Sequence, residues 1–231
     1  MKVLTALAFG VMASAQSGHW EGKIQIPGHE VLVAVDLAKD RAGSWIGAMS
    51  VLQSTSVDVP LAEIRIQGPE VRFKANLPEL ASFAGALAAD GNSISGSVNN
   101  SLGDAPFALS RAGEPKVNLP APSSALSKDF AGTWQGSIEI QGQELRVLVK
   151  LGAAPDGRAV ATLVSVDQGN LEIPATTVII AEKRLELEVR ALSGTYQGTL
   201  EANGRIAGEW SQGPIRSPLV LKRVAAEEAK Q

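Results

Sequence analysis

The sequence contains no cysteine and only two histidines, and this scarcity excludes several kinds of site. Disulfide frameworks, iron–sulfur clusters and cysteine nucleophiles need thiols, and His19 and His29 alone are too few for a structural zinc site. We therefore predict no metal and no cofactor. The chain also lacks a basic run. It has 21 Lys and Arg and 24 Asp and Glu, which gives a net charge of −3. This charge argues against nucleic acid as a partner.

Long apolar runs are equally rare, and the main one lies at the N-terminus. Met1-Lys2 precedes the apolar run Val3 to Met12, and the small residues Ala13-Ser14-Ala15 follow it. This order is typical of a cleaved signal peptide, so we predict a signal peptide over residues 1–15 and a secreted or periplasmic mature chain. A buried N-terminal helix is the alternative. The run is too short to cross a bilayer, so no membrane span is expected after cleavage.

The rest of the sequence consists of two related copies. When the chain is slid against itself so that Trp20 meets Trp134, the pattern Trp-x-Gly-x-Ile-x-Ile-x-Gly-x-Glu recurs, and matches continue in order to Arg111 and Arg223 with two single-residue gaps. A period this long indicates duplicated domains rather than a solenoid, whose units repeat every ~20–50 residues. We predict a first copy at 16–111, a Pro/Ser-rich linker at 112–132, a second copy at 133–223 and a charged tail at 224–231.

Each copy has the alternation of apolar and polar residues that is typical of half-buried strands. The predicted strands of the first copy span 19–27, 30–38, 44–52, 57–67, 70–76, 82–88, 93–99 and 105–111. The pairs Asp90-Gly91, Asp156-Gly157 and Asn203-Gly204 predict hairpins with type I′ turns, which need positive φ at both central residues. The Ala/Leu-rich run Leu80–Ala89 favours a helix by propensity. Because its counterpart around Tyr196 indicates a strand, we predict a strand there too.

Eight sequential strands predict an all-β fold, with two tandem antiparallel meander barrels of the lipocalin or avidin type. Closure into a barrel removes exposed strand edges, and an eight-stranded interior is filled by side chains or holds one small ligand. A sandwich is the alternative closure. Inward glycines at 22, 47, 85 and 96 are expected to relieve crowding where the strands coil sharply.

An ordered set of motifs in the second copy resembles a known domain. The motifs are Trp134-x-Gly136, Asp167-Gln168-Gly169 with Ile173-Pro174, Tyr196-x-Gly198, Gly208-x-Trp210-x-Gln212-Gly213 and Leu219-x-Leu221-x-Arg223. The series resembles the β-rich N-terminal domain of secreted bacterial α/β-hydrolases that are esterase-like or peptidase-like. The resemblance implies a hydrolase-associated domain, here present twice. The first copy departs from it, with Gln53-Ser54-Thr55 in place of Asp167-Gln168-Gly169.

The catalytic half of such hydrolases has no counterpart in this sequence. No Ser has Gly two residues before and two after it, as a nucleophile elbow requires, and both His precede every candidate nucleophile. We therefore predict a protein that is not an enzyme and has no catalytic residues. An unrecognised hydrolase is the least favoured alternative.

Seven residues are candidates for ligand binding. They are Trp20, Trp134, Asp167, Gln168, Tyr196, Trp210 and Gln212. The aromatic residues either anchor the core or line a cavity mouth, and core packing is the more common role. The Asp-Gln-Gly segment either pins its own turn or orients a ligand. His19, His29, Asp36 and Asp40 are expected to be solvated surface groups.

Two functions from different classes fit these observations. The first is a secreted, non-catalytic tandem module that binds a small ligand, a peptide or an envelope protein. The second is an accessory or structural domain that acts beside a separately encoded α/β-hydrolase. A cavity above ~300 Å³ with a few converging polar groups would favour small-molecule binding.

Overall fold

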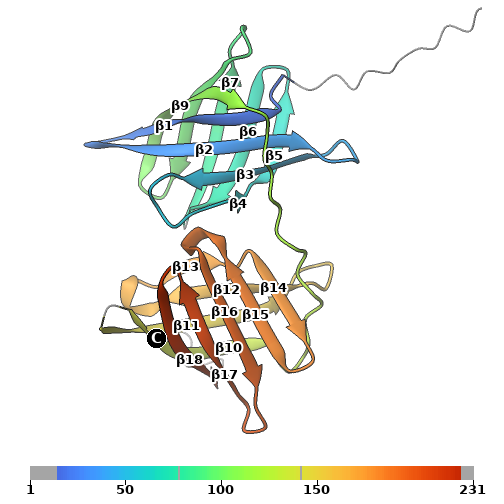
Figure 1. Cartoon of the computed structure of the whole chain (residues 1–231), viewed down its shortest axis with the longest axis vertical. Coiled ribbons are helices and arrows are strands. Elements are labelled where there is room, and N and C mark those ends of the chain that lie inside the picture. The colour runs from blue at the N-terminus through green and yellow to red at the C-terminus, as the bar shows by residue number, and fades with distance from the viewer. Residues whose placement is uncertain (1–14, 78, 141, 225–231) are drawn as a thin grey trace, which may run out of the picture.

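The protein consists of two antiparallel sheets in tandem (Figure 1). The computed structural model describes residues 15–77, 79–140 and 142–224. The predicted signal peptide up to residue 14 and the predicted tail from residue 225 lie outside the described residues. Within the described part there is no α-helix, and the predicted all-β class is confirmed.

Each sheet has nine strands. The first contains β1 (Gly18–Ile26), β2 (His29–Lys39), β3 (Trp45–Val51), β4 (Val59–Pro60), β5 (Ala62–Gln67), β6 (Glu70–Asn76), β7 (Leu80–Leu87), β8 (Ser93–Asn100) and β9 (Gly103–Gly113). The second contains β10 (Gly132–Ile140), β11 (Gln143–Ala153), β12 (Ala159–Ser165), β13 (Leu171–Pro174), β14 (Thr177–Ala181), β15 (Arg184–Val189), β16 (Gly194–Leu200), β17 (Arg205–Gln212) and β18 (Ile215–Val224). Two short 3-10 turns, η1 (Val166–Gln168) and η2 (Arg190–Leu192), complete the second copy.

Each sheet is a meander whose first and last strands pair with each other. The strand order is β4-β3-β2-β1-β9-β8-β7-β6-β5 in the first copy, and the second copy repeats it from β13 to β14. The two outer strands, β4 and β5, are consecutive in the chain and separated only by Leu61. Each sheet therefore curls until its two outer strands lie next to each other, joined by a short chain segment. Each sheet is thus barrel-like. The sandwich alternative requires two facing sheets in each copy and does not describe this arrangement.

The predicted count of eight strands is wrong by one, because the fourth strand is split. Pro60 pairs with Ala48 of β3, whereas Ala62 pairs with Lys74 of β6. Proline has no backbone N–H and cannot continue a ladder. The chain therefore changes partners around Leu61, and the predicted strand 57–67 becomes β4 and β5.

The Ala/Leu-rich run is a strand, as the repeat predicted. β7 pairs along its length with β6, and Phe83 faces Phe73 across the ladder. Its side chains at Ala81 and Phe83 are buried in the sheet interior. Burial of this alternating face outweighs the helix propensity of Ala and Leu.

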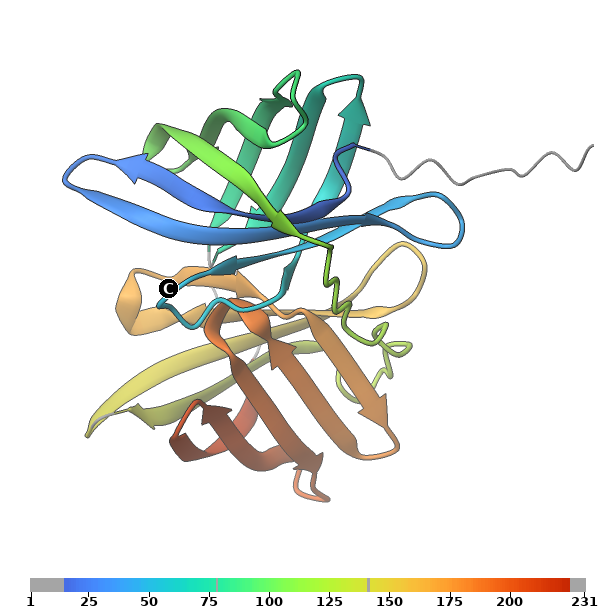
Figure 2. The same cartoon turned by 45° about the horizontal axis from the view of Figure 1, so that its top comes forward.

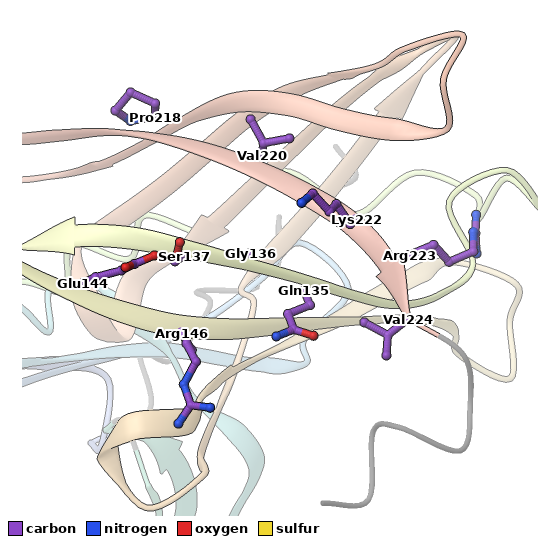
Figure 3. Close-up of a pocket in the computed structure, with 10 residues that line it drawn as sticks. All are labelled: Gln135, Gly136, Ser137, Glu144, Arg146, Pro218, Val220, Lys222, Arg223 and Val224. Carbon is purple, nitrogen blue, oxygen red and sulfur yellow. The ribbon is translucent and has the colours of Figure 1, made fainter.

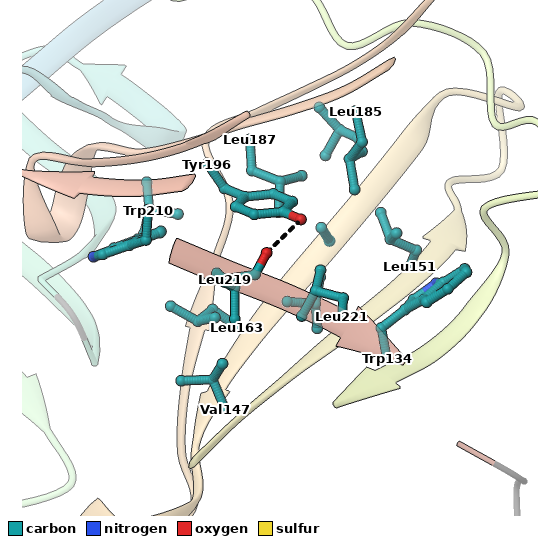
Figure 4. Packing of buried hydrophobic residues seen from close by; sticks show 14 of the residues in the cluster. Trp134, Val147, Leu151, Leu163, Leu185, Leu187, Tyr196, Trp210, Leu219 and Leu221 are labelled. Atoms are coloured by element: carbon teal, nitrogen blue, oxygen red, sulfur yellow. Dashed lines mark hydrogen bonds between the residues drawn. The ribbon is translucent and has the colours of Figure 1, made fainter. Parts of the chain in front are cut away.

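Each copy has its own hydrophobic core, and no residue belongs to both. In the first, Phe83 stacks on Phe73 with ring centroids 4.8 Å apart and meets Phe107 edge-on at 5.6 Å. In the second, Tyr196 and Trp210 lie in the cluster that Figure 4 shows, with Trp134 at its opposite end. Two matched cores confirm the tandem architecture that the sequence repeat predicted.

The linker binds along one side of the second sheet, as Figures 1 and 2 show, rather than hanging free. Ser123 Oγ accepts a hydrogen bond from Val178 N at 3.0 Å, and Ser124 Oγ accepts one from Ile180 N at 2.8 Å. The backbone of Ser124 also bonds Ala159 N at 2.7 Å. The linker thereby bridges β12 and β14, where the second sheet splits.

Candidate functional site

A cavity of about 550 Å³ opens at one end of the second barrel. The turns between β10 and β11, β12 and β13, β15 and β16, and β17 and β18 all lie at this end. The lining comprises Thr55, Ile138, Ile140, Leu145, Val147, Leu163, Ser165, Gln168, Leu171, Ile173, Leu192, Ser193, Trp210, Gln212, Gly213, Pro214 and Ile215. All except Thr55 come from the second copy.

The cavity is a bowl with a packed floor. Val147, Ile173 and Trp210 are each at most 2% exposed and form part of this floor. Half-buried side chains such as Leu145 and Leu171 form the wall. The barrel interior is therefore filled with side chains below the bowl, and only its mouth is hollow.

Polar groups converge at the rim of the bowl. Ser165 Oγ donates to Gln168 Oε1 at 2.8 Å, and Trp210 Nε1 donates to Gln212 Oε1 at 3.4 Å. An indole N–H can only donate, so the Gln212 oxygen must be the atom that faces it. Both amide oxygens accept from groups of the protein, and neither NH₂ group has a hydrogen-bond partner among the described residues, so both can donate to a bound molecule.

No charged side chain lines the bowl among the described residues. Arg146, Arg190 and Arg216 belong to the strands and turns around it, and each already has partners. Arg146 binds the Asp167 carboxylate, Arg190 Nε donates to Glu188 at 2.9 Å, and Arg216 Nη1 donates to the Gly213 and Ile215 carbonyls. The cavity is apolar with an uncharged polar rim.

Asp167 lies outside the bowl and fixes its own loop. Its carboxylate accepts from Arg146 N at 2.7 Å, from Arg146 Nε at 2.9 Å and from Arg146 Nη2 at 2.6 Å. These hydrogen bonds lower the pKa of Asp167 from its ordinary value. Of the two interpretations of the Asp-Gln-Gly segment, Asp167 therefore takes the turn-pinning one, while Gln168 reaches the cavity.

Trp20 and Trp134 do not line the cavity and lie fully buried instead. Trp134 Nε1 donates to the Phe130 carbonyl at 2.8 Å, and Trp20 Nε1 donates to the Gln16 carbonyl at 3.2 Å. The guanidinium of Arg223 lies 4.3 Å from the Trp134 ring, and that of Arg111 lies 4.2 Å from Trp20. Of the two interpretations of these aromatic residues, both tryptophans therefore take the core-anchor role, which corrects their selection as ligand-binding candidates.

Tyr196 is also a core residue rather than a cavity residue. Its hydroxyl lies 3.2 Å from the carbonyl oxygens of Ile206 and Leu219 and donates toward them, and Figure 4 shows the second contact. Burial raises the pKa of Tyr196 well above its ordinary value. The hydroxyl is satisfied inside the barrel and unavailable to a ligand, which corrects the prediction for this residue.

A loop of the first barrel covers part of the bowl. Ser56, which is buried, donates from Oγ to the Ala191 carbonyl at 2.8 Å, and Ser193 Oγ donates to the Thr55 carbonyl. Arg190 Nη1 donates to the carbonyls of Asp58, at 3.0 Å, and Asn118, at 2.5 Å. These bonds hold residues 52–58 against η2, which brings Thr55 to the cavity.

A larger hollow of about 730 Å³ lies on the outer face of the second barrel (Figure 3). It is lined by the charged residues Glu144, Arg146, Lys222 and Arg223, by the polar residues Gln135 and Ser137, and by Gly136, Pro218, Val220 and Val224. Arg146 is already bound to Asp167, and Arg223 lies over Trp134 and donates to the Asp129 carbonyl at 2.6 Å. The smaller bowl is the better candidate for a small-molecule site, because an open, polar and charged surface offers a small molecule little burial.

One pair of predicted surface groups is only partly solvated. His19 Nδ1 lies 2.9 Å from Asp36 Oδ1 and Nε2 lies 3.2 Å from Glu21 Oε1. Burial alone would lower the pKa of His19, but the two carboxylates together raise it. Asp36 is 7% exposed and also accepts from Lys116 N at 2.7 Å, so the prediction of a solvated Asp36 is wrong. The carboxylate instead joins the first sheet to the linker.

The described residues contain no cluster of three or more His, Asp or Glu that could hold a metal ion. Over the same part of the chain, no helix has the length and apolar character needed to cross a membrane.

Sequence reasoning found three of the cavity residues, Gln168, Trp210 and Gln212, and missed the aliphatic wall. Leu145, Leu192 and Ile215 lie within a few residues of turns, where polar side chains are the usual expectation. The sequence did contain one signal for this wall, namely apolar residues beside those turns that lie at one end of the barrel. Thr55 had no signal, because the packing of one barrel on another is not visible in a sequence.

No protein-family model matches this chain, and no curated protein matches it. Among solved structures, it is similar to a protein of unknown function from the DUF3598 family of Nostoc punctiforme, with 14% identity, 91% of this chain and 97% of that chain covered, and a TM-score of 0.28. It is also similar to a "putative outer membrane protein" from Bacteroides fragilis, with 11% identity, coverage of 91% and 99%, and a TM-score of 0.30. TM-scores this low carry no conclusion about fold or activity.

Proposed function

We propose that the protein is a non-catalytic module whose second barrel binds a small apolar molecule in its mouth. The observation that carries this proposal is the bowl of about 550 Å³, with an aliphatic wall, an indole in its floor and a few polar side chains at its rim. Its volume lies within the range of ~300–1,000 Å³ that small-molecule sites occupy.

Binding is tested with the neutral fluorescent probe N-phenylnaphthylamine, whose emission rises in apolar sites. The purified protein is expected to bind it, and Leu145→Trp is expected to abolish binding, because the indole would fill the bowl. The repeat supplies a matched control in Val31→Trp, at the equivalent half-buried position of the first barrel. The proposal fails if the wild-type protein does not bind the probe or if both variants bind it equally.

The proposed location of this module is outside the cytoplasm, and it rests on the order of residues 1–15. The mass of the protein purified from its native host tests the proposal. A chain that begins at Gln16 is expected, and an intact Met1 would contradict export by a cleaved signal. Association with an α/β-hydrolase stays a prediction from the motif series, since no contact in the structure favours it over ligand binding.

A further inference from the structure

The hydrogen-bonding groups at the rim limit which apolar molecules the bowl can bind. The inference drawn from them rests on the proposed function. We infer that the ligand is an uncharged amphipathic molecule with an aliphatic body and a carbonyl-type oxygen at its polar end. Esters, amides and monoglycerides of medium-length acids belong to this class. Fatty-acid anions and alkylammonium ions do not.

The first argument is the direction of the hydrogen-bonding groups. Gln168 Oε1 accepts from Ser165, and Gln212 Oε1 accepts from the indole of Trp210. Each amide therefore presents its NH₂ group, and no other hydrogen-bond partner of Gln168 or Gln212 is found in the described part of the chain. Because two donors lie at the same rim, a ligand with a hydrogen-bond acceptor fits them best. A carbonyl oxygen is such an acceptor and has two lone pairs, one for each donor.

The second argument is the absence of a free charge. A charged group that gives up part of its hydration at the rim without meeting an opposite charge loses more solvation than neutral hydrogen bonds return. Arg146, Arg190 and Arg216 are each bound to a carboxylate or to backbone carbonyls. The described lining of the bowl contains no cation that could neutralise an anionic head group and no carboxylate that could neutralise a cationic one.

The third argument concerns where the polar end of the ligand lies. Gln168 and Thr55 are exposed at the rim, and Gln212 is half-buried there, whereas the floor contains Val147 and Ile173. The aliphatic part is therefore expected on the floor and the oxygen at the rim. Thr55 of the first barrel lies on this side, so a polar head would sit between the two barrels.

The test is displacement of N-phenylnaphthylamine by three ligands of equal chain length. These are glycerol monolaurate, which is neutral, laurate, which is an anion, and dodecylammonium, which is a cation, each below its micellar concentration. Glycerol monolaurate is expected to displace the probe at concentrations at least about tenfold lower than either ion. Laurate or dodecylammonium binding as tightly as the ester would overturn this inference and leave ligand binding intact. A protein that does not bind the probe at all would instead overturn the proposed function.

Two variants test whether the rim recognises the carbonyl oxygen of the ligand or whether binding depends on its aliphatic part alone. Gln168→Leu and Gln212→Leu each remove a rim donor and are expected to weaken glycerol monolaurate about twofold to tenfold, the usual value of one neutral hydrogen bond. The affinity of the probe, which has no carbonyl, should stay within about twofold. Gln197→Leu, an exposed glutamine on the outer face of β16, serves as the control. Equal monolaurate affinity in all three variants would contradict the assignment of the donors.

Discussion

At the scale of single residues, the two copies share one arrangement of a Trp and an Arg at the start of the barrel. In each, a buried Trp donates its indole N–H to a carbonyl four residues earlier, and an Arg from the last strand lies over the ring. The guanidinium also donates to the carbonyls that precede the first strand, from Arg111 to Ser17 and from Arg223 to Asp129. The Trp–Arg pair therefore ties the entering chain to the closing strand, which explains why both residues recur in the two copies.

Tyr196 gives the first prediction, because it is the only tyrosine in the chain. Burial raises the pKa of its hydroxyl in the folded state, while the unfolded chain ionises near pH 10. Above that pH the unfolded state loses a proton that the folded state keeps, so the free energy of unfolding falls as pH rises. We expect tyrosinate absorbance to appear together with loss of near-UV circular dichroism in an alkaline titration.

Two outcomes decide this prediction. Tyrosinate that forms near pH 10 while the circular dichroism stays native would contradict a buried hydroxyl. In Tyr196→Phe, the part of the alkaline fall in the free energy of unfolding that comes from this hydroxyl should disappear. At neutral pH the variant is expected to lose about 1 kcal/mol of unfolding free energy, because the hydrogen bonds of the hydroxyl are lost. The first copy has Phe83 at the equivalent position, so the ring itself fits without a hydroxyl.

At the scale of strands, glycines permit close contact between neighbours. Gly198 of β16 pairs with Gly208 of β17, as Gly85 pairs with Gly96 in the first copy. A Cβ at Gly208 would collide with the Gln197 carbonyl oxygen and with Gly198 Cα. The strands approach more closely here than side chains allow, which is how a small barrel achieves sharp coiling. The expectation for Gly85 and Gly96 is confirmed.

The second prediction follows from this close approach. Gly208→Ala is expected to lower the free energy of unfolding by about 1–3 kcal/mol, because the added methyl group must push two backbones apart. Gly152→Ala in β11 is the matched control, since a Cβ there meets only Val160 Cγ2, at 3.9 Å. Urea denaturation of both variants measures the difference. A Gly208→Ala variant as stable as Gly152→Ala would show that the strands are free to separate.

The sequence predicted which segments are strands more accurately than how they end. Alternation of apolar and polar residues identified β6, because a period of two survives in any half-buried sheet, whereas the comparison of the two copies identified β7. The predicted type I′ turns are wrong. Gly91, Gly157 and Gly204 have positive φ, but the Asp or Asn before each does not. Instead, the Asp or Asn carboxyl or amide oxygen accepts a backbone N–H two residues later, which stabilises a different turn.

At the scale of the whole molecule, equivalent positions have diverged so that only one barrel mouth carries the proposed site. Tyr196, Trp210 and Leu219 of the second copy stand where the first has Phe83, Val98 and Phe107. The first copy fills its interior with stacked phenyl rings and uses the loop of residues 52–58 to cover its neighbour. The repeat could predict two similar folds, but not this division of roles, because contacts between copies leave no periodic pattern.

Arg190 joins three parts of the molecule, and the last prediction concerns its removal. Its side chain is 12% exposed, and it bonds Glu188 of its own barrel, Asp58 of the first barrel and Asn118 of the linker. Charge-assisted hydrogen bonds of this kind contribute about 1.5–3 kcal/mol, so Arg190→Ala should weaken the coupling between the barrels, leaving the Ser56–Ala191 and Ser193–Thr55 hydrogen bonds. We expect calorimetric unfolding to separate into two transitions, one for each core.

The control is Arg184→Ala, which removes an exposed guanidinium from β15, the strand that leads into η2, where it pairs with Glu186 at 2.8 Å. An exposed ion pair contributes little, so this variant should unfold like the wild-type protein. Arg190→Ala should also weaken probe binding, because residues 52–58 would then be held against η2 only by the Ser56–Ala191 and Ser193–Thr55 hydrogen bonds, and Thr55 would be held less firmly at the bowl. An Arg190→Ala variant with the wild-type transition and probe affinity would contradict the role of Arg190 in coupling the barrels and in holding the loop of residues 52–58.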